Sequence, residues 1–496
     1  MSYQVQSLQL WCICRKMTKL LSVPQQVVIK PIPSLTGYTP NELFTALAKQ
    51  PHSIFLDSSK ELSIETFSIL LWDPVLSVES HSQQTNMHLH KKFARVFPDT
   101  NPVSLGSNTS PFMMVKDLHQ QLLTGLEIVA QDSPSLPFLI GFAGHFGYDL
   151  GAYIESFAPE KLGEYATADM GCHLYTHSLI YAHHTDTYYL CYLSNGANEE
   201  MVINDLIEML HKAPNDGFTL AKEWQANLTE QEYCTKLDKI HEYILAGDCY
   251  QTNFAQRFDN QYSGNEYTYY QKLRQANKAP FSSYVATPQG AILSLSPERF
   301  IQVKDNIVET KPIKGTMPRD SNPVIDQQNA TTLLASHKDQ AENLMIVDLL
   351  RNDLSKHCIA GTIQVPKLFA LESYPAVHHM VSTVTGKLAQ KEDVYDLLEG
   401  AFPGGSITGA PKIRAMEIIQ ELEPNGRNIY CGSIGYIGLR YDMDTNICIR
   451  TLLCENERIY CWAGGGIVLD SVGPNEYQET LDKISKIIPK KESIRT

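Results

Sequence analysis

The sequence predicts an α+β protein in which antiparallel β-sheet and amphipathic helices pack as one large body. Two observations carry this prediction. Short apolar, β-branched runs occur in pairs joined by tight turns, which is typical of β-hairpins. Between them lie segments whose apolar residues are spaced three and four apart, as on one face of a helix. The chain of 496 residues is long enough for several domains of about 100–200 residues or for one large body.

Three hairpins are predicted in the second half of the chain. They are SSYVATPQGAILSLS around Pro-Gln-Gly, RFIQVKDNIVETKPI around Asp305 and Asn306, and NICIRTLLCENERIYCWAGGG around Glu-Asn-Glu. In the first half, LYTHSLIYAHHTDTYYLCYL is a further strand candidate. Because hairpins join antiparallel neighbours, we expect antiparallel sheet.

Four helices are predicted between and after these strands. Their sequences are TEQEYCTKLDKIHEYILAGD, DQAENLMIVDLLRNDLSK, GAPKIRAMEIIQELEP and NEYQETLDKISKIIPK. The first begins at Thr229 with acids in its first turn and ends at Gly247, which suits a helix cap at each end. The polar segment 212–228 is the best boundary, so we expect an N-terminal extension at 1–25, a first region at 26–225 and a second at 226–490.

Composition excludes several classes of protein. The net charge of −14 disfavours nucleic acid as a partner, because an acidic surface repels phosphate backbones. No apolar run approaches the roughly 20 residues of a membrane helix, and the N-terminal apolar run is too broken for a signal peptide. The 11 cysteines lack regular spacing, and no second pair follows Cys12 and Cys14 to complete a zinc site. We expect a cytoplasmic protein with reduced thiols.

Two pairs of carboxylates have the spacing of a helix face. Asp339 and Glu342 are three residues apart, and Glu476 and Glu479 repeat this arrangement. Acids at this spacing are common on solvated faces. Here Glu342 adjoins the apolar NLMIVDLL, and Glu476 follows the glycine-rich AGGGIVLDSVGP. If the two pairs face each other, they suit Mg²⁺, which takes one or two carboxylates and leaves positions for an anionic substrate.

Glycine-rich loops leave ligand binding open. The loop PGGSITGAPK at 403–412 lacks the Gly-Lys-Ser/Thr of a phosphate-binding loop, and AGGGIV is not GxGxxG, so nucleotide binding is disfavoured. Two roles remain for these loops. Their backbone N–H groups bind an anion at close range, or the glycines only form tight turns with no ligand.

Three single residues have both a structural and a chemical interpretation. Arg450 lies in the apolar run NICIRTLL, where it either clamps a substrate carboxylate or forms an internal ion pair. His379 is either a proton carrier or, more commonly, a satisfied core histidine. Lys314, in VETKPIKGTMPR, is an outward strand lysine, or else a desolvated and therefore nucleophilic amine.

Seven motifs in fixed order carry a resemblance to a known family. They are SPERF, KPIKGTMPR, AENLMIVDLLRNDL, AFPGGSITGAPKIRAMEII, CGSIGY, IRTL and AGGGIVLDS, within about residues 226–488. In these motifs the chain resembles the chorismate-utilising enzymes, which include component I of anthranilate synthase and of aminodeoxychorismate synthase. LPFLIGFAGHFGYDLGAYIE is a weaker match to the N-terminal region of that family.

The resemblance implies a fold of two packed antiparallel β-sheets flanked by helices, with chorismate bound by the region 226–490. It implies Mg²⁺ held by Glu342 and Glu479, with Asp339 and Glu476 assisting through water, although relatives usually carry Glu in place of Asp339. The ion would hold the ring carboxylate of chorismate. The other implied substrate-binding residues are Arg450, Tyr430, Lys483, Gly464 and Gly466 at the carboxylates, and Gly315, Thr316 and Thr408 along the pocket.

Particular positions favour the aminodeoxychorismate branch of the family. Anthranilate synthases typically read PIAGT and SPES where this chain reads PIKGT and SPERF. In isochorismate- and salicylate-forming relatives, a water-activating lysine stands in the place of Gln251. Because glutamine takes up no proton at neutral pH, Gln251 is expected only to bind substrate.

The resemblance then implies a role for Lys314 and Glu298. The amine of Lys314 would attack C2 of chorismate while Glu298 protonates the departing C4 hydroxyl. Ammonia would attack C4 and expel the lysine, giving 4-amino-4-deoxychorismate for 4-aminobenzoate and folate biosynthesis. His379 matches a histidine of the family's active site, with its proton role left open.

The ammonia is expected from a separate glutaminase subunit. The best candidate for a glutaminase nucleophile in this chain, Cys172 in MGCHLY, lacks the second glycine of a nucleophile elbow. Two alternatives remain: component I of anthranilate synthase, and a non-catalytic chorismate-binding subunit. The presence of both Glu298 and Lys314 with the metal-binding acids disfavours the second. FLDSSKE lies where relatives begin a tryptophan pocket, which leaves tryptophan binding open.

Overall fold

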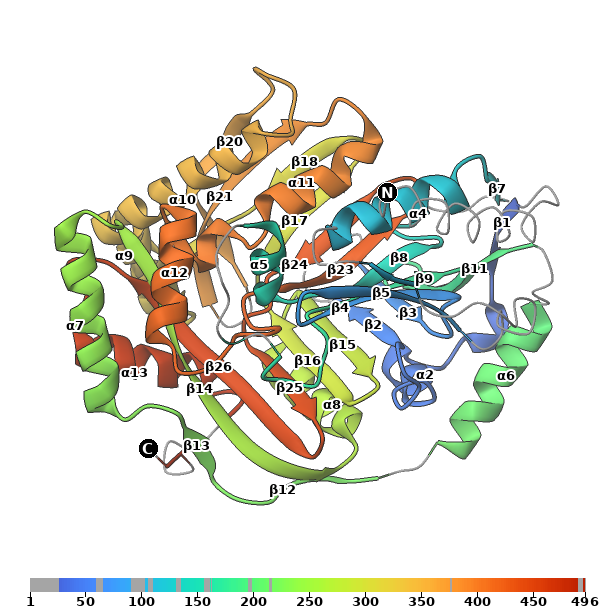
Figure 1. The fold of residues 1–496 in the computed structure, drawn as a ribbon. Coiled ribbons are helices and arrows are strands. Elements are labelled where there is room, and N and C mark those ends of the chain that lie inside the picture. Colours follow the sequence, from blue (N-terminus) through green and yellow to red (C-terminus); the bar gives the residue numbers. More distant parts are fainter. Residues whose placement is uncertain are drawn as a thin grey trace.

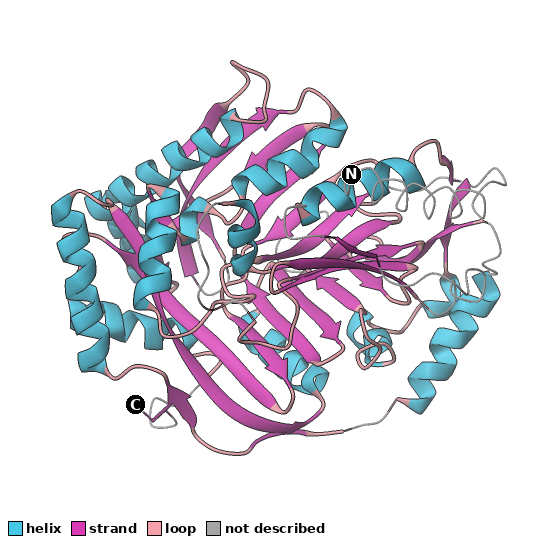
Figure 2. Ribbon diagram, viewed as in Figure 1, coloured by secondary structure: helices cyan, strands magenta, loops and turns pink. Residues whose placement is uncertain are grey.

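The computed structural model describes residues 26–58, 66–90, 103–105, 110–130, 135–155, 161, 163–194, 199–213, 216–374, 377–488 and 494–495. The predicted extension 1–25, with Cys12 and Cys14, lies outside the described residues. The described chain forms two large, mainly antiparallel sheets with helices around them (Figure 1 and Figure 2), which confirms the predicted α+β fold.

The larger sheet, sheet A, has 15 strands in the described part of the chain. In spatial order they are β27 (Ile494–Arg495), β13 (Trp224–Ala226), β14 (Gln251–Gly264), β26 (Arg458–Ile467), β25 (Thr451–Glu455), β16 (Gly290–Ser296), β15 (Phe281–Thr287), β2 (Ile54–Asp57), β3 (Phe67–Leu71), β10 (His177–Ala182), β11 (Thr187–Leu193), β1 (Gln26–Pro31) and β7 (Glu127–Ala130), with β12 (Phe218–Leu220) and β22 (Gly409–Ala410) paired to β14.

The second sheet, sheet B, has 12 strands among the described residues. Their order is β19 (Ile313–Pro318), β21 (Val377–Lys387), β18 (Ile307–Thr310), β17 (Arg299–Lys304), β24 (Met443–Asn446), β23 (Ser433–Gly438), β8 (Gly141–Phe146), β9 (Met170–Tyr175), β4 (Leu76–His81), β5 (Gln84–Leu89) and β6 (Val103–Leu105), with β20 (Gln364–Ser373) paired to β21.

Both sheets run across the predicted boundary between the two sequence regions. In sheet A, Phe55 of β2 pairs with Tyr284 of β15. In sheet B, Ala143 of β8 pairs with Tyr436 of β23. The segment 212–228 itself contributes β12 and β13. The two regions therefore form one body, while their exact bounds stay a prediction.

Two apolar cores hold the sheets and helices together. Ile292 of β16 belongs to the core that also holds Leu76 of β4 and Phe142 of β8, so this core lies between the sheets. The next residue, Leu293, belongs to the other core, with Tyr233 and other helix side chains. Successive strand residues point to opposite faces. Sheet A is consequently covered by sheet B on one face and by helices on the other.

The four helices predicted from apolar spacing are confirmed as α7, α10, α12 and α13, and the described residues form further helices that the sequence analysis did not predict. Their bounds are α2 (Pro40–Thr45), α4 (Pro111–Leu123), α5 (Gly151–Ile154), α6 (Glu199–Lys212), α7 (Glu230–Ala246), α8 (Glu266–Asn277), α9 (Pro323–Ala335), α10 (His337–Ser355), α11 (Val394–Ala401), α12 (Lys412–Leu422) and α13 (Gly473–Ile484). The predicted caps of α7 are confirmed: Thr229 forms a capping box with Glu232, and Gly247 has φ 83°. None of the described helices is long and apolar enough to span a membrane.

The three predicted hairpins are β15–β16, β17–β18 and β25–β26. The third differs from the prediction in its bounds. β24 ends at Asn446 and β25 begins only at Thr451, so Arg450 lies in the connection and not inside a strand. Its φ of 52° is in the left-handed region, which strands do not use.

Candidate active site

Lys314 lies in an irregular part of β19. This strand pairs with β21, but the register shifts between Ile313 and Thr316, so Lys314 and Gly315 form a bulge. Gly315 has φ 81°, a conformation that glycine adopts without steric cost. Bulges re-aim side chains. Lys314 is half-buried, and its Nζ donates a hydrogen bond to the carbonyl of Ser406 at 3.3 Å.

The surroundings of Lys314 favour its uncharged amine. Burial lowers the pKa of Lys314 below its usual value, and the positive charge of Lys483 lowers it further. The carboxylates of Glu298, Glu342 and Glu479 oppose this without cancelling it. Acids from several elements therefore lie within electrostatic reach of the amine. A lysine with a lowered pKa is a better nucleophile at neutral pH.

Glu298 lies between β16 and β17 and is 7% exposed. Burial raises its pKa to about 7, although nearby Lys314, the Ile313 backbone N–H and Ser406 act in the opposite direction. The Ser406 hydroxyl donates to Oε1 of Glu298 at 3.4 Å. Near neutral pH a substantial share of this carboxyl is protonated, as a general acid requires.

His379 of β21 faces β19. It pairs in register with Thr316, whose hydroxyl lies 2.9 Å from its Nδ1. Burial lowers the pKa of His379 to about 4, and the charge of Arg450 adds to this, against the opposing influence of Glu372. The imidazole is therefore neutral at pH 7, so it is able to accept a proton but does not carry an extra proton that it could donate.

Arg450 is half-buried, and its guanidinium has no hydrogen bond or ion pair with any residue that the structure describes. Of the two interpretations offered by the sequence, the internal ion pair is therefore absent among the described residues. A partly buried cation without an anion is unfavourable unless a ligand supplies one. The geometry leaves Arg450 available for a carboxylate.

The two pairs of acids project from α10 and α13. Burial raises the pKa of Glu342, and the negative charges of Asp339 and Glu476 raise it further, which places acids of both helices within electrostatic reach. Asp339 also lies against the bulge, since a β-carbon at Gly315 would stand 2.9 Å from its carboxyl carbon.

Lysines and a serine neutralise or hold these acids in the structure. Lys483 lies 2.7 Å from Glu479, and Lys338 lies 3.9 Å from Glu342. Glu476 is buried and accepts from the Ser471 hydroxyl at 2.8 Å. No three of the four acids bring ligand oxygens within 4.8 Å of one another. Acids of the two helices thus lie within electrostatic reach of one another without being drawn into a single ligand sphere.

The glycine run of β26 lies beside the acids of α13. Lys483 Nζ donates to the carbonyl of Gly464 at 2.8 Å. The space above Gly466 holds the amide of Gln251, because a β-carbon there would stand 2.3 Å from Nε2 of Gln251. Gly465, which the sequence interpretation did not single out, faces the acids: its β-carbon would lie 3.4 Å from Glu476 Oε2.

Two predicted substrate-binding residues have mainly structural partners. Thr408 is buried, and its hydroxyl donates to the carbonyl of Gly404 at 3.1 Å. Tyr430 is 3% exposed and stacks on Trp462 with ring centroids 6.1 Å apart. Ser406 is the residue that sequence reasoning missed; only its place in the loop PGGSITGAPK could have indicated it.

Comparison with known proteins identifies the family of this chain. Residues 52–489 match the family model for chorismate binding enzyme. Aminodeoxychorismate synthase component 1 of Escherichia coli (strain K12) is 43% identical over 446 residues, covering 90% of this chain and 94% of that protein. Anthranilate synthase component 1 of Aquifex aeolicus (strain VF5) is 34% identical, covering 70% of this chain and 73% of that protein.

Solved structures have the same fold. Anthranilate synthase component I of Streptococcus pneumoniae TIGR4 superposes with a TM-score of 0.69 at 29% identity, covering 84% of this chain and 91% of that chain. MenF, the menaquinone-specific isochorismate synthase of Escherichia coli, has a TM-score of 0.67 at 17% identity, which concerns the fold alone. The chain belongs to the family of chorismate-binding enzymes.

Proposed function

We propose that this chain is component I of an aminodeoxychorismate synthase, which converts chorismate and ammonia to 4-amino-4-deoxychorismate for 4-aminobenzoate and folate biosynthesis. The identity of 43% with the Escherichia coli protein of that name, over most of both chains, supports this branch of the family. The proposal rests mainly on Lys314 and Glu298, which both form hydrogen bonds with Ser406. The pKa of the Lys314 amine is lowered and the pKa of the Glu298 carboxyl is raised.

In the proposed reaction Lys314 is the nucleophile. Its neutral amine forms a bond to C2 of chorismate as the C4 hydroxyl departs, and the proton from Glu298 makes the leaving group water. Ammonia then forms a bond to C4, the C2–N bond to Lys314 breaks, and its electron pair returns to the amine. Two easier displacements replace one difficult one.

We further propose that Arg450 binds a substrate carboxylate. We also propose that His379 takes part in proton transfer and that its imidazole is neutral before it does so. The unpaired guanidinium of Arg450 supports the first assignment. The same proposal assigns substrate contacts to Lys483, Gln251 and Tyr430, to Thr316 and Thr408, and to the backbones of Gly315, Gly464 and Gly466.

Mg²⁺ suits the acids of α10 and α13. They are all oxygen donors, and the 51% exposed side chain of Glu479 is open to an entering ion. We propose that Glu342 and Glu479 bind the ion directly and that Asp339 and Glu476 hold its water. When bound, the ion neutralises and orients a carboxylate of the substrate. Lys338 and Lys483, which now neutralise two of these acids, would be released to the substrate anion.

We propose that a separate glutaminase subunit supplies the ammonia. Cys172, the candidate nucleophile in this chain, is 2% exposed on β9, and burial holds the pKa of its thiol well above the usual range. A protonated, buried thiol is a poor nucleophile. We expect a cytoplasmic setting, which the free thiols of all the described cysteines support.

The test is product identification. The full chain incubated with chorismate, MgCl₂ and an ammonium salt should yield 4-amino-4-deoxychorismate by mass spectrometry, without release of pyruvate. The relatives named anthranilate synthase favour the alternative, which releases pyruvate and a fluorescent aromatic amine. Anthranilate as the main product would reject the proposal. Chorismate binding without turnover would identify a non-catalytic subunit.

A further inference from the structure

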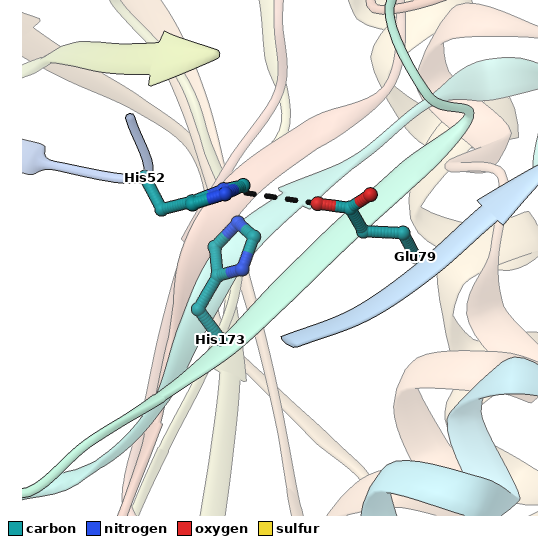
Figure 3. Close-up of side chains that lie close together, drawn as sticks. All are labelled: His52, Glu79 and His173. Carbon is teal, nitrogen blue, oxygen red and sulfur yellow. Dashed lines mark ion pairs between the residues drawn. The ribbon is translucent and has the colours of Figure 1, made fainter. Parts of the chain in front are cut away.

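A second group of polar side chains lies where the two sheets meet. His52 precedes β2 of sheet A, whereas Glu79 and His173 lie on β4 and β9 of sheet B (Figure 3). One ligand atom from each of the three lies within 4.8 Å of the other two. Nδ1 of His52 is 3.7 Å from Oε1 of Glu79. Among the described residues, no other group of three His, Cys, Asp or Glu side chains is as close.

The strand register gathers these side chains on one face of sheet B. Ser77 pairs with His173, and Glu79 pairs with Gly171. On the other side of β9, Gly171 pairs with His145 of β8. Paired residues and alternate residues along a strand share a face. Glu79, His173 and His145 therefore point to the same side, toward the segment that carries His52.

Gly171 keeps the centre of this face open. A β-carbon there would stand 3.1 Å from Nδ1 of His145 and 3.2 Å from Nε2 of His173, so both nitrogens border the same small volume. His145 is 3% exposed, and its Nε2 lies 3.0 Å from the carbonyl of Ala168. Its Nδ1 is buried without a hydrogen-bond partner in the described part of the chain. An unpartnered buried nitrogen thus faces the group.

Hydrogen bonds fix the ring of His173. Its Nδ1 lies 2.7 Å from the Ser77 hydroxyl, which also lies 2.6 Å from Nε2 of His90. Nε2 of His173 has no hydrogen-bond partner among the described residues, and Figure 3 shows a ring nitrogen of His173 directed at His52. A histidine held through one nitrogen and open at the other has the usual arrangement of a metal ligand.

The backbone around His52 is also fixed. Its φ of 65° lies in the left-handed region, which a residue with a side chain adopts only when its surroundings impose it. Its N–H donates to the carbonyl of Ala286 on β15 at 2.8 Å, and its carbonyl accepts from the Tyr175 hydroxyl of β9. These contacts from both sheets hold the imidazole of His52 over Glu79.

The group is open to an entering ion. The side chains of His52 and Glu79 are 13% and 28% exposed. A metal binds imidazole through an unprotonated ring nitrogen, and Nδ1 of His52 is the ring atom that faces Glu79. Imidazole and carboxylate together suit Zn²⁺ and related transition metals better than Mg²⁺.

We propose that His52, Glu79 and His173 bind one divalent transition-metal ion of the Zn²⁺ class, which fastens sheet A to sheet B. His145, whose unpartnered Nδ1 borders the same volume as Nε2 of His173, is a candidate for a fourth ligand. Zn²⁺ ligand distances of about 2.0–2.2 Å put tetrahedral ligand atoms about 3.4 Å apart, slightly less than the 3.7 Å between His52 and Glu79. The other two pairs of ligand atoms lie within 4.8 Å, so side-chain rotations on binding must close the remaining separations. The site is separate from the acids near Lys314 and does not depend on the proposed function.

The experiment measures zinc bound to the full chain. Cys12→Ser and Cys14→Ser form the parent background, because two neighbouring thiols, although too few for a complete zinc site, could still retain some zinc in this assay. The chelator-treated parent is dialysed against ZnCl₂ in excess MgCl₂, and bound zinc is counted by elemental analysis. We expect one zinc per chain, and a zinc-dependent rise in the unfolding temperature. Failure of the parent to bind zinc overturns the proposal.

Variants assign the ligands. His52→Ala and the nearly isosteric Glu79→Gln should lose the bound zinc and the rise in unfolding temperature, and Ser77→Ala should weaken binding by about 10- to 100-fold. His211→Ala, on the exposed end of α6, and Glu342→Gln, in the other site, should retain one zinc. Far-ultraviolet circular dichroism of the metal-free variants checks folding. Unchanged zinc affinity in both His52→Ala and Glu79→Gln contradicts the assignment.

Discussion

Lys314 and Glu298 share one neighbour, Ser406, which accepts a hydrogen bond from the amine through its carbonyl and donates one to the carboxyl through its hydroxyl. Burial moves the two pKa values in opposite directions, down for the amine and up to about 7 for the acid. Both changes favour the uncharged form. A neutral amine beside a protonated carboxyl is the combination that attacks a ring carbon and protonates a leaving hydroxyl.

Glu298→Gln should lower kcat for amination by about 10²- to 10⁴-fold, the usual contribution of a general acid. Glutamine keeps the size of the side chain and donates no proton, so KM for chorismate should change far less than kcat. Steady-state kinetics with chorismate and an ammonium salt measures this. Glu242→Gln, on the exposed face of α7, is the matched control. A variant with near-parental kcat would remove Glu298 from the chemistry.

The same substitution should stabilise the fold at alkaline pH. The pKa of Glu298 is raised from 4.5 to about 7 by burial, so the folded state holds its proton more tightly than the unfolded state. This contribution to stability is fully present below pH 4.5 and is lost as pH rises through 7. A pKa difference of about 2.5 corresponds to about 3 kcal/mol.

Thermal unfolding at two pH values tests this prediction. Glu298→Gln carries no ionisable group at this position, so its unfolding temperature should exceed that of the parent at pH 8 and match it near pH 4.5. An equal difference at both pH values would show that ionisation of Glu298 is not the cause.

Arg450→Ala should raise KM for chorismate by about 10- to 150-fold, because a hydrogen bond to a charged group contributes about 1.5–3 kcal/mol. Arg450→Lys should recover only part of this, since an ammonium does not make the paired contact of a guanidinium. Because the guanidinium has no partner in the described residues, neither change should lower the unfolding temperature in the absence of substrate. An unaltered KM in both variants would show that Arg450 does not bind a carboxylate of chorismate.

Removal of Mg²⁺ should abolish amination, and restoring it should recover the activity. Glu342→Gln and Glu479→Gln should each raise the Mg²⁺ concentration for half-maximal rate by more than about 10-fold. Asp339→Asn, which acts through water in the proposal, should have a smaller effect. Activity titrated with MgCl₂ after chelation gives these values. Amination that persists in a chelator would contradict a role for these acids in metal binding.

Local sequence was sufficient for much of the fold. The box formed by Thr229 and Glu232 and the glycine at 247 set both ends of α7. Asp305 and Asn306 tolerate the positive φ of 51° and 64° that the β17–β18 turn requires. These features depend on a few neighbouring residues, so they can be read from a short stretch.

Features made by distant contacts were harder to predict. The apolar sequence around Arg450 predicts a strand, but long-range contacts impose a turn there. One of them is the hydrogen bond that the Leu295 N–H donates to the Arg450 carbonyl. The bulge at Lys314 depends on the register with β21. His52, Glu79 and His173 come from three separate segments that only the packing of the two sheets brings together. No local spacing signals such a group.

Intact-mass analysis of the full chain during turnover tests the central claim, that Lys314 is a covalent nucleophile. With chorismate and MgCl₂ but without ammonia, the parent should carry an adduct equal to chorismate less one water, located on Lys314 by peptide mapping. Lys314→Ala should carry none, while His211→Ala should carry the parental amount. An adduct that persists in Lys314→Ala, or that maps to another residue in the parent, would contradict the account.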